Sequence, residues 1–172
     1  MKRGLFKEEV EACDLREEKQ HIHISRSPSN LEEYLKQTIR FQPKLISFSY
    51  ITTGSDPSWP GERILCCSMC WQNTRSFSWN WKETPIKLFR KIMENPNIIK
   101  ATDSKKMMGA WTESRVPRTS LNNHLELVIN DYSIFHYNNK ITEENKLLFC
   151  GYNSLFVYRK AADHLINTGM IK

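Results

Sequence analysis

The stretch from Arg63 to Lys82, RILCCSMCWQNTRSFSWNWK, gives the strongest indication of fold in this sequence. Two runs rich in apolar and aromatic residues, Arg63–Trp71 and Arg75–Lys82, are separated by the polar residues Gln72-Asn73-Thr74. Side chains alternate between the two faces of a strand, and both faces of the first run are largely apolar. This pattern is typical of a strand covered on both sides. The stretch therefore predicts a central β-hairpin.

Helical and strand-like segments are mixed on either side of this hairpin. Apolar residues at helical spacing predict helices over 5–18, 29–41, 85–94, 142–149 and 160–167. Ser29-Asn-Leu-Glu32 matches a capping box for the second of these helices, and Gly169 would close the last. Short strands are predicted at 20–25, 45–53, 124–129, 133–137 and 155–158, whereas 98–118 is the least regular region. Without regular βαβ alternation, the sequence predicts an α+β fold: a mostly antiparallel sheet with a central hairpin (about 63–82) and helices packed against it.

The length of 172 residues predicts one domain spanning 1–172, with residues 5–41 as an alternative N-terminal helical subdomain. Five cysteines form an odd number without the regular spacing of a disulfide framework, so we expect reduced, buried thiols. Cys67 and Cys70 would point to opposite faces of a strand, which argues against a zinc site. The N-terminus lacks the pattern of a signal peptide, and no run of residues is apolar enough to span a bilayer. We expect an intracellular protein, cytoplasmic or nuclear and not secreted, that contacts no membrane and needs no cofactor.

The net charge of +6 is unevenly distributed. Ten positive and four negative side chains lie between Thr74 and Arg118, so the whole excess falls in this segment. Basic residues interleaved with exposed rings suit a surface that tracks phosphates and stacks on bases. We therefore predict a nucleic-acid-binding module for RNA or single-stranded DNA. Its predicted contact residues are Arg75, Lys82, Lys87, Arg90, Lys91, Lys105, Lys106, Arg115, Arg118, Trp79, Trp81 and Trp111.

Two alternatives use the same residues differently. The alternation in Phe77-Ser-Trp-Asn-Trp81 also fits a half-buried strand whose three rings pack in the core. A basic surface could equally meet an acidic protein, which would make the chain an interaction module or a regulator of a larger assembly. Trp59 and Trp111 would then be the anchors of the interface.

A third hypothesis concerns His21-Ile22-His23. On a strand, residues two apart point the same way, so both imidazoles could bind one divalent metal ion. The triplet resembles the His-hydrophobic-His motif of replication-initiator and relaxase nucleases. That resemblance implies a metal that polarises a phosphate and an attacking tyrosine, here Tyr34 or Tyr158, but it covers only these residues. No other enzyme motif is complete, so we expect a binding module rather than an enzyme.

Overall fold

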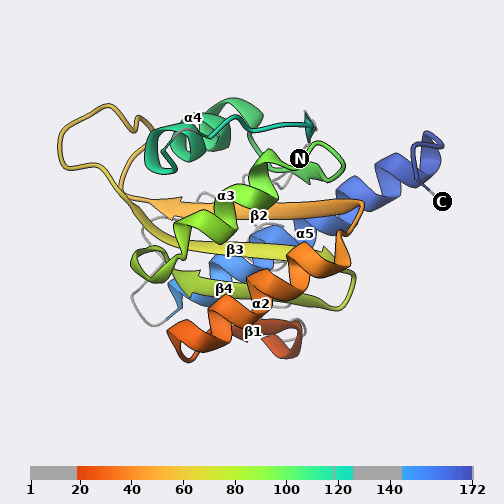
Figure 1. Cartoon of the computed structure of the whole chain (residues 1–172), viewed down its shortest axis with the longest axis horizontal. Coiled ribbons are helices and arrows are strands. Elements are labelled where there is room, and N and C mark those ends of the chain that lie inside the picture. The colour runs from red at the N-terminus through yellow and green to blue at the C-terminus, as the bar shows by residue number, and fades with distance from the viewer. Residues whose placement is uncertain (1–18, 118, 126–144, 172) are drawn as a thin grey trace, which may run out of the picture.

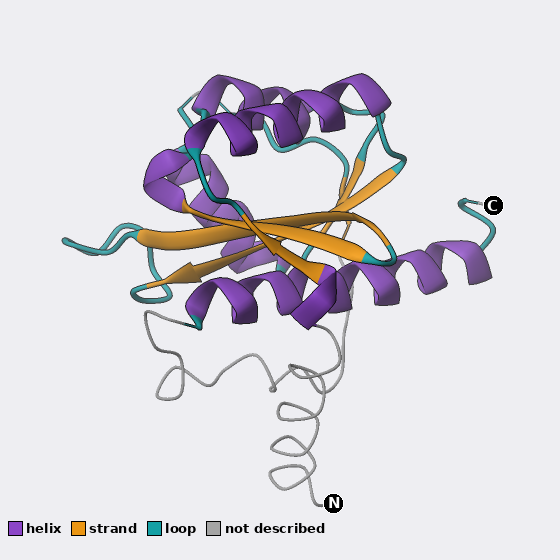
Figure 2. Cartoon of the chain, turned by 90° about the horizontal axis from the view of Figure 1, so that it is seen from below, coloured by secondary structure: helices purple, strands orange, loops and turns teal. Residues whose placement is uncertain are grey.

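The computed structural model describes residues 19–117, 119–125 and 145–171. A six-stranded sheet in the order β1-β4-β3-β2-β5-β6 lies between two helical layers. Helices α2, α3 and α4 pack on one face, and the long helix α5 crosses the other (Figure 1 and Figure 2). The elements are η1 (Lys19–His21), β1 (Ile22–Ile24), α2 (Pro28–Phe41), β2 (Leu45–Thr52), β3 (Ile64–Gln72), β4 (Arg75–Asn80), η2 (Trp81–Glu83), α3 (Ile86–Glu94), β5 (Ile99–Ala101), α4 (Lys105–Arg115), β6 (His124–Leu125) and α5 (Lys146–Asn167). No helix in these described ranges is long and apolar enough to cross a membrane.

The predicted α+β class and the central hairpin are confirmed. Strands β3 and β4 form the hairpin, and β2 extends it as a third antiparallel strand. The expectation of a mostly antiparallel sheet was loose, because β1 pairs with β4, β5 with β2 and β6 with β5 in parallel. Each parallel pair is joined by a long connection that contains a helix: α2 lies between β1 and β4 in the sequence, α3 between β2 and β5, and α4 between β5 and β6. Parallel neighbours need crossover connections of this kind.

Helix α2 begins two residues earlier than the capping box predicted. Ser27 is the N-cap, and its hydroxyl accepts a hydrogen bond of 3.2 Å from the backbone N–H of Asn30. Pro28 then takes the first helical position, where its missing N–H costs nothing. The helix ends at Phe41, because Gln42 adopts a left-handed conformation (φ 49°) and Pro43 follows. This placement puts Asn30, Tyr34 and Gln37 on the side of α2 that faces the edge of the sheet.

The C-terminal prediction was partly wrong. The expected strand at 155–158 and the helix at 160–167 belong to one helix, α5, which begins at Lys146. The apolar run that suggests a strand instead supplies the buried side of this helix, because helical spacing brings Leu155, Ala161 and Leu165 together. Region 98–118 is also more regular than expected, since it holds β5 and α4. The predictions at 5–18 and 133–137 lie outside the described residues, as does most of that at 124–129. Of the helix predicted at 142–149, residues 146–149 form the first turn of α5, and 142–144 lie outside the described residues.

The two faces of the sheet have different cores. The face under α2, α3 and α4 is large and aromatic, with Phe48, Met69 and Trp79 buried among residues of those helices. The face under α5 is lined by small polar side chains, and Ser68 donates a hydrogen bond of 2.6 Å to the carbonyl of Cys150 on α5. Small side chains let α5 approach the sheet closely.

The cysteine prediction is confirmed for the described thiols: Cys66, Cys67, Cys70 and Cys150 are free and buried. Cys13 lies outside the described residues. Burial raises the pKa of Cys70 to about 12 and that of Cys67 well above its ordinary value. These two thiols are therefore neutral packing groups and not nucleophiles.

Candidate functional site

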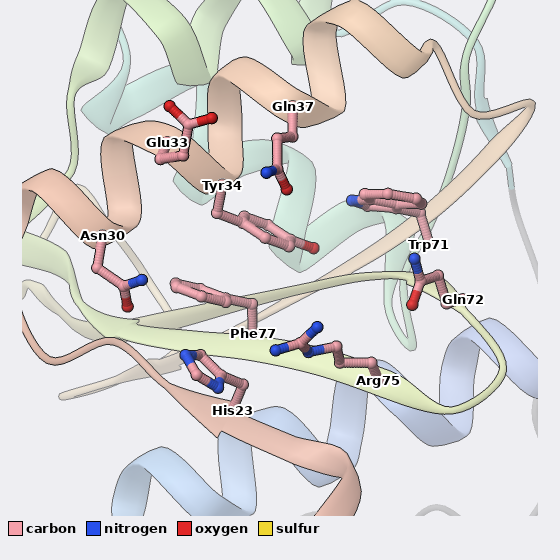
Figure 3. A pocket seen from close by; sticks show the side chains of 9 residues that line it. All are labelled: His23, Asn30, Glu33, Tyr34, Gln37, Trp71, Gln72, Arg75 and Phe77. Carbon is pink, nitrogen blue, oxygen red and sulfur yellow. The ribbon is translucent and has the colours of Figure 1, made fainter.

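A pocket of about 260 Å³ opens between α2 and the edge of the sheet where β3, β4 and β1 lie side by side (Figure 3). Four separate segments supply its walls. Its lining residues are His23 from β1, Asn30, Glu33, Tyr34 and Gln37 from α2, Trp71 and Gln72 from β3, and Arg75 and Phe77 from β4. The turn of the β3–β4 hairpin brings the last four of these together.

A series of aromatic rings runs along this pocket, and all of them except the last, Phe41, line it. The ring of His23 stacks on Phe77 at a centroid distance of 4.9 Å, and Phe77 stacks on Tyr34 at 4.2 Å. Tyr34 is followed by Trp71 at 6.3 Å, and Trp71 by Phe41 at 4.9 Å. All four pairs are within 30° of parallel. The step between Tyr34 and Trp71 is the widest of the four, and Phe41 at the end of the series is 65% exposed.

Hydrogen bonds hold the rings of Tyr34 and Trp71 in position. The Tyr34 hydroxyl donates to the carbonyl of Met69 at 3.3 Å, and the Trp71 Nε1–H donates to the hydroxyl of Thr38 at 2.9 Å. Burial raises the pKa of Tyr34 well above its ordinary value, an effect that the nearby Arg75 guanidinium partly opposes. Tyr34 is therefore a neutral hydrogen-bond donor at physiological pH, and these rings form a preorganised wall.

The rim of the pocket is polar and carries one free positive charge. Within the described ranges, no hydrogen bond or ion pair joins the Arg75 guanidinium to another residue. Glu33 is different, because its Oε1 accepts a hydrogen bond of 3.1 Å from Arg40 and its charge is thereby compensated. Figure 3 shows the Gln37 amide above Tyr34, and Gln72 beside Trp71 and Arg75. The rim thus offers a cation and neutral amides around a ring-lined floor.

The predicted basic residues fall into two groups. Arg75, Lys82, Lys87, Lys91, Lys105 and Lys106 are exposed. Arg90 and Arg115 are partly buried and donate to backbone carbonyls, Arg90 to Pro117 at 3.1 Å and Arg115 to Pro57 and Glu62. Arg118 lies outside the described residues. Of the predicted cations that the structure describes, only Arg75 also lines the aromatic pocket.

The predicted stacking role of the tryptophans was wrong for two of the three. Trp79 is 1% exposed and Trp111 is fully buried, because both rings face the core beneath the helices. Trp79 also donates through Nε1 to the hydroxyl of Thr84 at 2.8 Å. Trp81 is partly buried and meets Phe89 edge to face at 5.5 Å. The packing alternative therefore holds for this strand.

The same burial removes Trp111 as an interface anchor, whereas Trp59 is 64% exposed at the tip of the β2–β3 loop. The loop is held by the two hydrogen bonds from Arg115 to its backbone. The guanidinium carbon of Arg115 in turn lies 4.9 Å from the centre of the Trp111 ring. Trp111 thus contacts the arginine that holds the loop.

The metal site proposed for His21 and His23 is not assembled. His21 lies in the turn η1 and only His23 lies in a strand, so they are not alternating residues of one strand. Burial raises the pKa of both candidate tyrosines, Tyr34 and Tyr158, so both phenols are protonated at neutral pH.

Sequence reasoning missed most of the pocket. Tyr34 and Gln37 are one turn apart on the predicted second helix, and Trp71 and Gln72 end the first strand of the predicted hairpin. Those spacings indicate that each pair lies together, but nothing local indicates that the pairs face each other. Arg75 was found because it lies in the basic segment.

Comparisons with known proteins find solved structures with a similar fold. No family model matches the sequence, and no curated protein is significantly similar to it. The structure resembles the catalytic core of RRP6 from Trypanosoma brucei (TM-score 0.58, 12% identity), matching over 87% of this chain and 48% of that one. It also resembles the Aedes aegypti Nibbler EXO domain (TM-score 0.56, 11% identity, 86% and 90% covered). Brucella melitensis NrnC is a further match (TM-score 0.55, 9% identity, 87% and 82% covered).

At these identities the likeness shows the shared fold. The chain spans about half the length of the RRP6 core that it matches. NrnC has also been solved with bound Mg²⁺, an ion that prefers carboxylate and other oxygen ligands. Within residues 19–117, 119–125 and 145–171, no group of three or more His, Cys, Asp or Glu side chains is arranged to hold a metal ion.

Proposed function

We propose that this chain binds single-stranded nucleic acid, with the aromatic pocket and Arg75 as its working site. The observation that carries the proposal is the ring series from His23 to Phe41 with an unpaired guanidinium at its rim. Aromatic platforms beside cations are the usual means of binding unpaired bases, since every base has a face that can stack. A base in a duplex could not enter this pocket without leaving its pair.

Charge on the neighbouring helix supports this proposal. Helix α3 packs beside α2 and carries the exposed Lys87 and Lys91, opposite its buried side chains Phe89 and Ile92. Cations outside the pocket would hold the phosphates of a strand whose base lies inside it. The fold likeness to RRP6 and the Nibbler EXO domain, a catalytic core and an exonuclease domain, agrees with a nucleic-acid ligand.

Fluorescence anisotropy with labelled ten-nucleotide RNA, single-stranded DNA and duplex DNA at several salt concentrations tests this proposal. We expect single strands to bind more tightly than duplex. The slope of log K against log salt should fall by about 0.7 in Arg75→Ala, because one phosphate contact is lost. Lys160→Ala is the matched control, since Lys160 is an exposed cation on α5, across the sheet. Absence of binding at low salt, or equal effects of the two substitutions, would refute the proposal.

A second candidate is nucleic-acid hydrolysis, which the fold likeness to exonuclease domains favours. Incubation of end-labelled RNA with Mg²⁺ or Mn²⁺ would test it. A shortening activity that co-purifies with the protein and is abolished by EDTA would favour hydrolysis. Intact RNA under conditions in which the protein binds it would leave binding as the function.

A further inference from the structure

The volume of the aromatic pocket limits the size of the ligand that it can bind. Ligand pockets for drug-sized molecules are typically about 300–1,000 Å³, and this pocket, at about 260 Å³, lies just below that range. It has space for one planar ring system and not for two stacked nucleotides. The site therefore fits a single base, with the rest of the strand outside.

The polar side chains of the rim are able to distinguish one base from another. Within the described residues, the Gln37 and Gln72 side-chain amides make no hydrogen bond, and both residues are exposed. An amide carries both an acceptor and two donors, which can match the donor and acceptor pattern of a base edge. Arg75 offers donors only and is suited to a phosphate.

We infer that the pocket binds one unpaired nucleobase and that Gln37 and Gln72 select it by its edge, with Arg75 beside the attached phosphate. The base stacks on the wall formed by Tyr34 and Trp71, whose rings are fixed by hydrogen bonds. This inference rests on the proposed binding of single strands. It adds that binding is base-selective, which stacking and charge alone would not produce.

The test compares ten-nucleotide oligomers of A, C and U with an abasic oligomer of the same length by fluorescence anisotropy. We expect one base to bind at least about tenfold more tightly than the abasic strand and also more tightly than the other two bases. In Gln37→Ala/Gln72→Ala the three base-bearing oligomers should differ by less than about twofold, with abasic binding unchanged. The matched control is Asn167→Ala, which removes an exposed amide from the far end of α5. Thermal unfolding checks that each variant is folded.

The outcomes separate this inference from the proposed function. If all oligomers, including the abasic one, bind equally, the base pocket is refuted while single-strand binding stands. If selectivity persists in the double variant, Gln37 and Gln72 do not read the base and the inference falls. If no oligomer binds at low salt, the inference and the proposed function fall together.

Discussion

Gly151 lies in the second turn of α5, against strands β1 and β4, and its replacement by alanine tests that packing. A Cβ atom at this position would overlap Cγ2 of Ile22 and would lie 2.6 Å from the Ser78 hydroxyl oxygen. Favourable separations between non-bonded carbon atoms are about 3.5–4.0 Å, so the helix or the strands would have to move by about 1 Å. The serine hydroxyl can rotate away, but the β-branched Ile22 has few alternative rotamers.

The expected change in the free energy of unfolding of Gly151→Ala is the sum of two opposing contributions. Overpacking a core typically costs about 1–3 kcal/mol, and overlap with two strands at once places Gly151→Ala at the upper end. Alanine is favoured over glycine inside a helix by about 1 kcal/mol. We therefore expect a net loss of about 2 kcal/mol in the free energy of unfolding. With an m value of about 2 kcal/mol/M, the urea midpoint should fall by about 1 M.

Gly109 provides a matched control, because it also lies inside a helix, α4. The nearest atom to a Cβ at Gly109 is Nδ1 of His124 at 3.8 Å, which is an ordinary contact. Gly109→Ala should therefore be neutral or stabilising by up to about 1 kcal/mol. Urea unfolding followed by far-ultraviolet circular dichroism measures both. A midpoint for Gly151→Ala equal to or above that of the unsubstituted protein would show that α5 does not approach the sheet as described.

Two further predictions concern the other side of the sheet. Burial, with a contribution from neighbouring lysines, lowers the pKa of His124 to about 4 from about 6.5. Since the folded state takes up this proton less readily than the unfolded state, stability should fall by about 1–2 kcal/mol as the pH drops from 6.5 to 4. Unfolding of His124→Gln at both pH values should show a smaller loss, and an identical loss would exclude His124 as its cause. Arg115→Ala removes the hydrogen bonds to the Pro57 and Glu62 carbonyls, so the Trp59 loop should be cut faster by chymotrypsin, with a stability loss of about 1–3 kcal/mol. Unchanged cleavage would show that the loop does not depend on this arginine.

The sequence predicted those elements whose pattern is local. The hairpin of β3 and β4 was readable because alternation and strand length coincide, and α2 because its apolar residues recur every three or four positions. The strand predicted at residues 155–158 was wrong because a short apolar run is compatible with either a strand or a buried helix. Only the packing of α5 over the sheet decides between them.

The sequence by itself determined the fold class, the buried thiols and the segment that holds the excess positive charge. It could not decide which rings of that segment are exposed, because alternation gives the two faces of a strand but not which layer covers each. The tertiary structure placed Trp79 and Trp111 under the helices and left Trp81 only partly buried. It also brought Tyr34 next to Trp71 and Arg75, residues on α2, β3 and β4, by packing a helix across a sheet edge. The candidate site exists only through that packing, because stacking needs rings within about 7 Å, and sequence separation gives no measure of that distance.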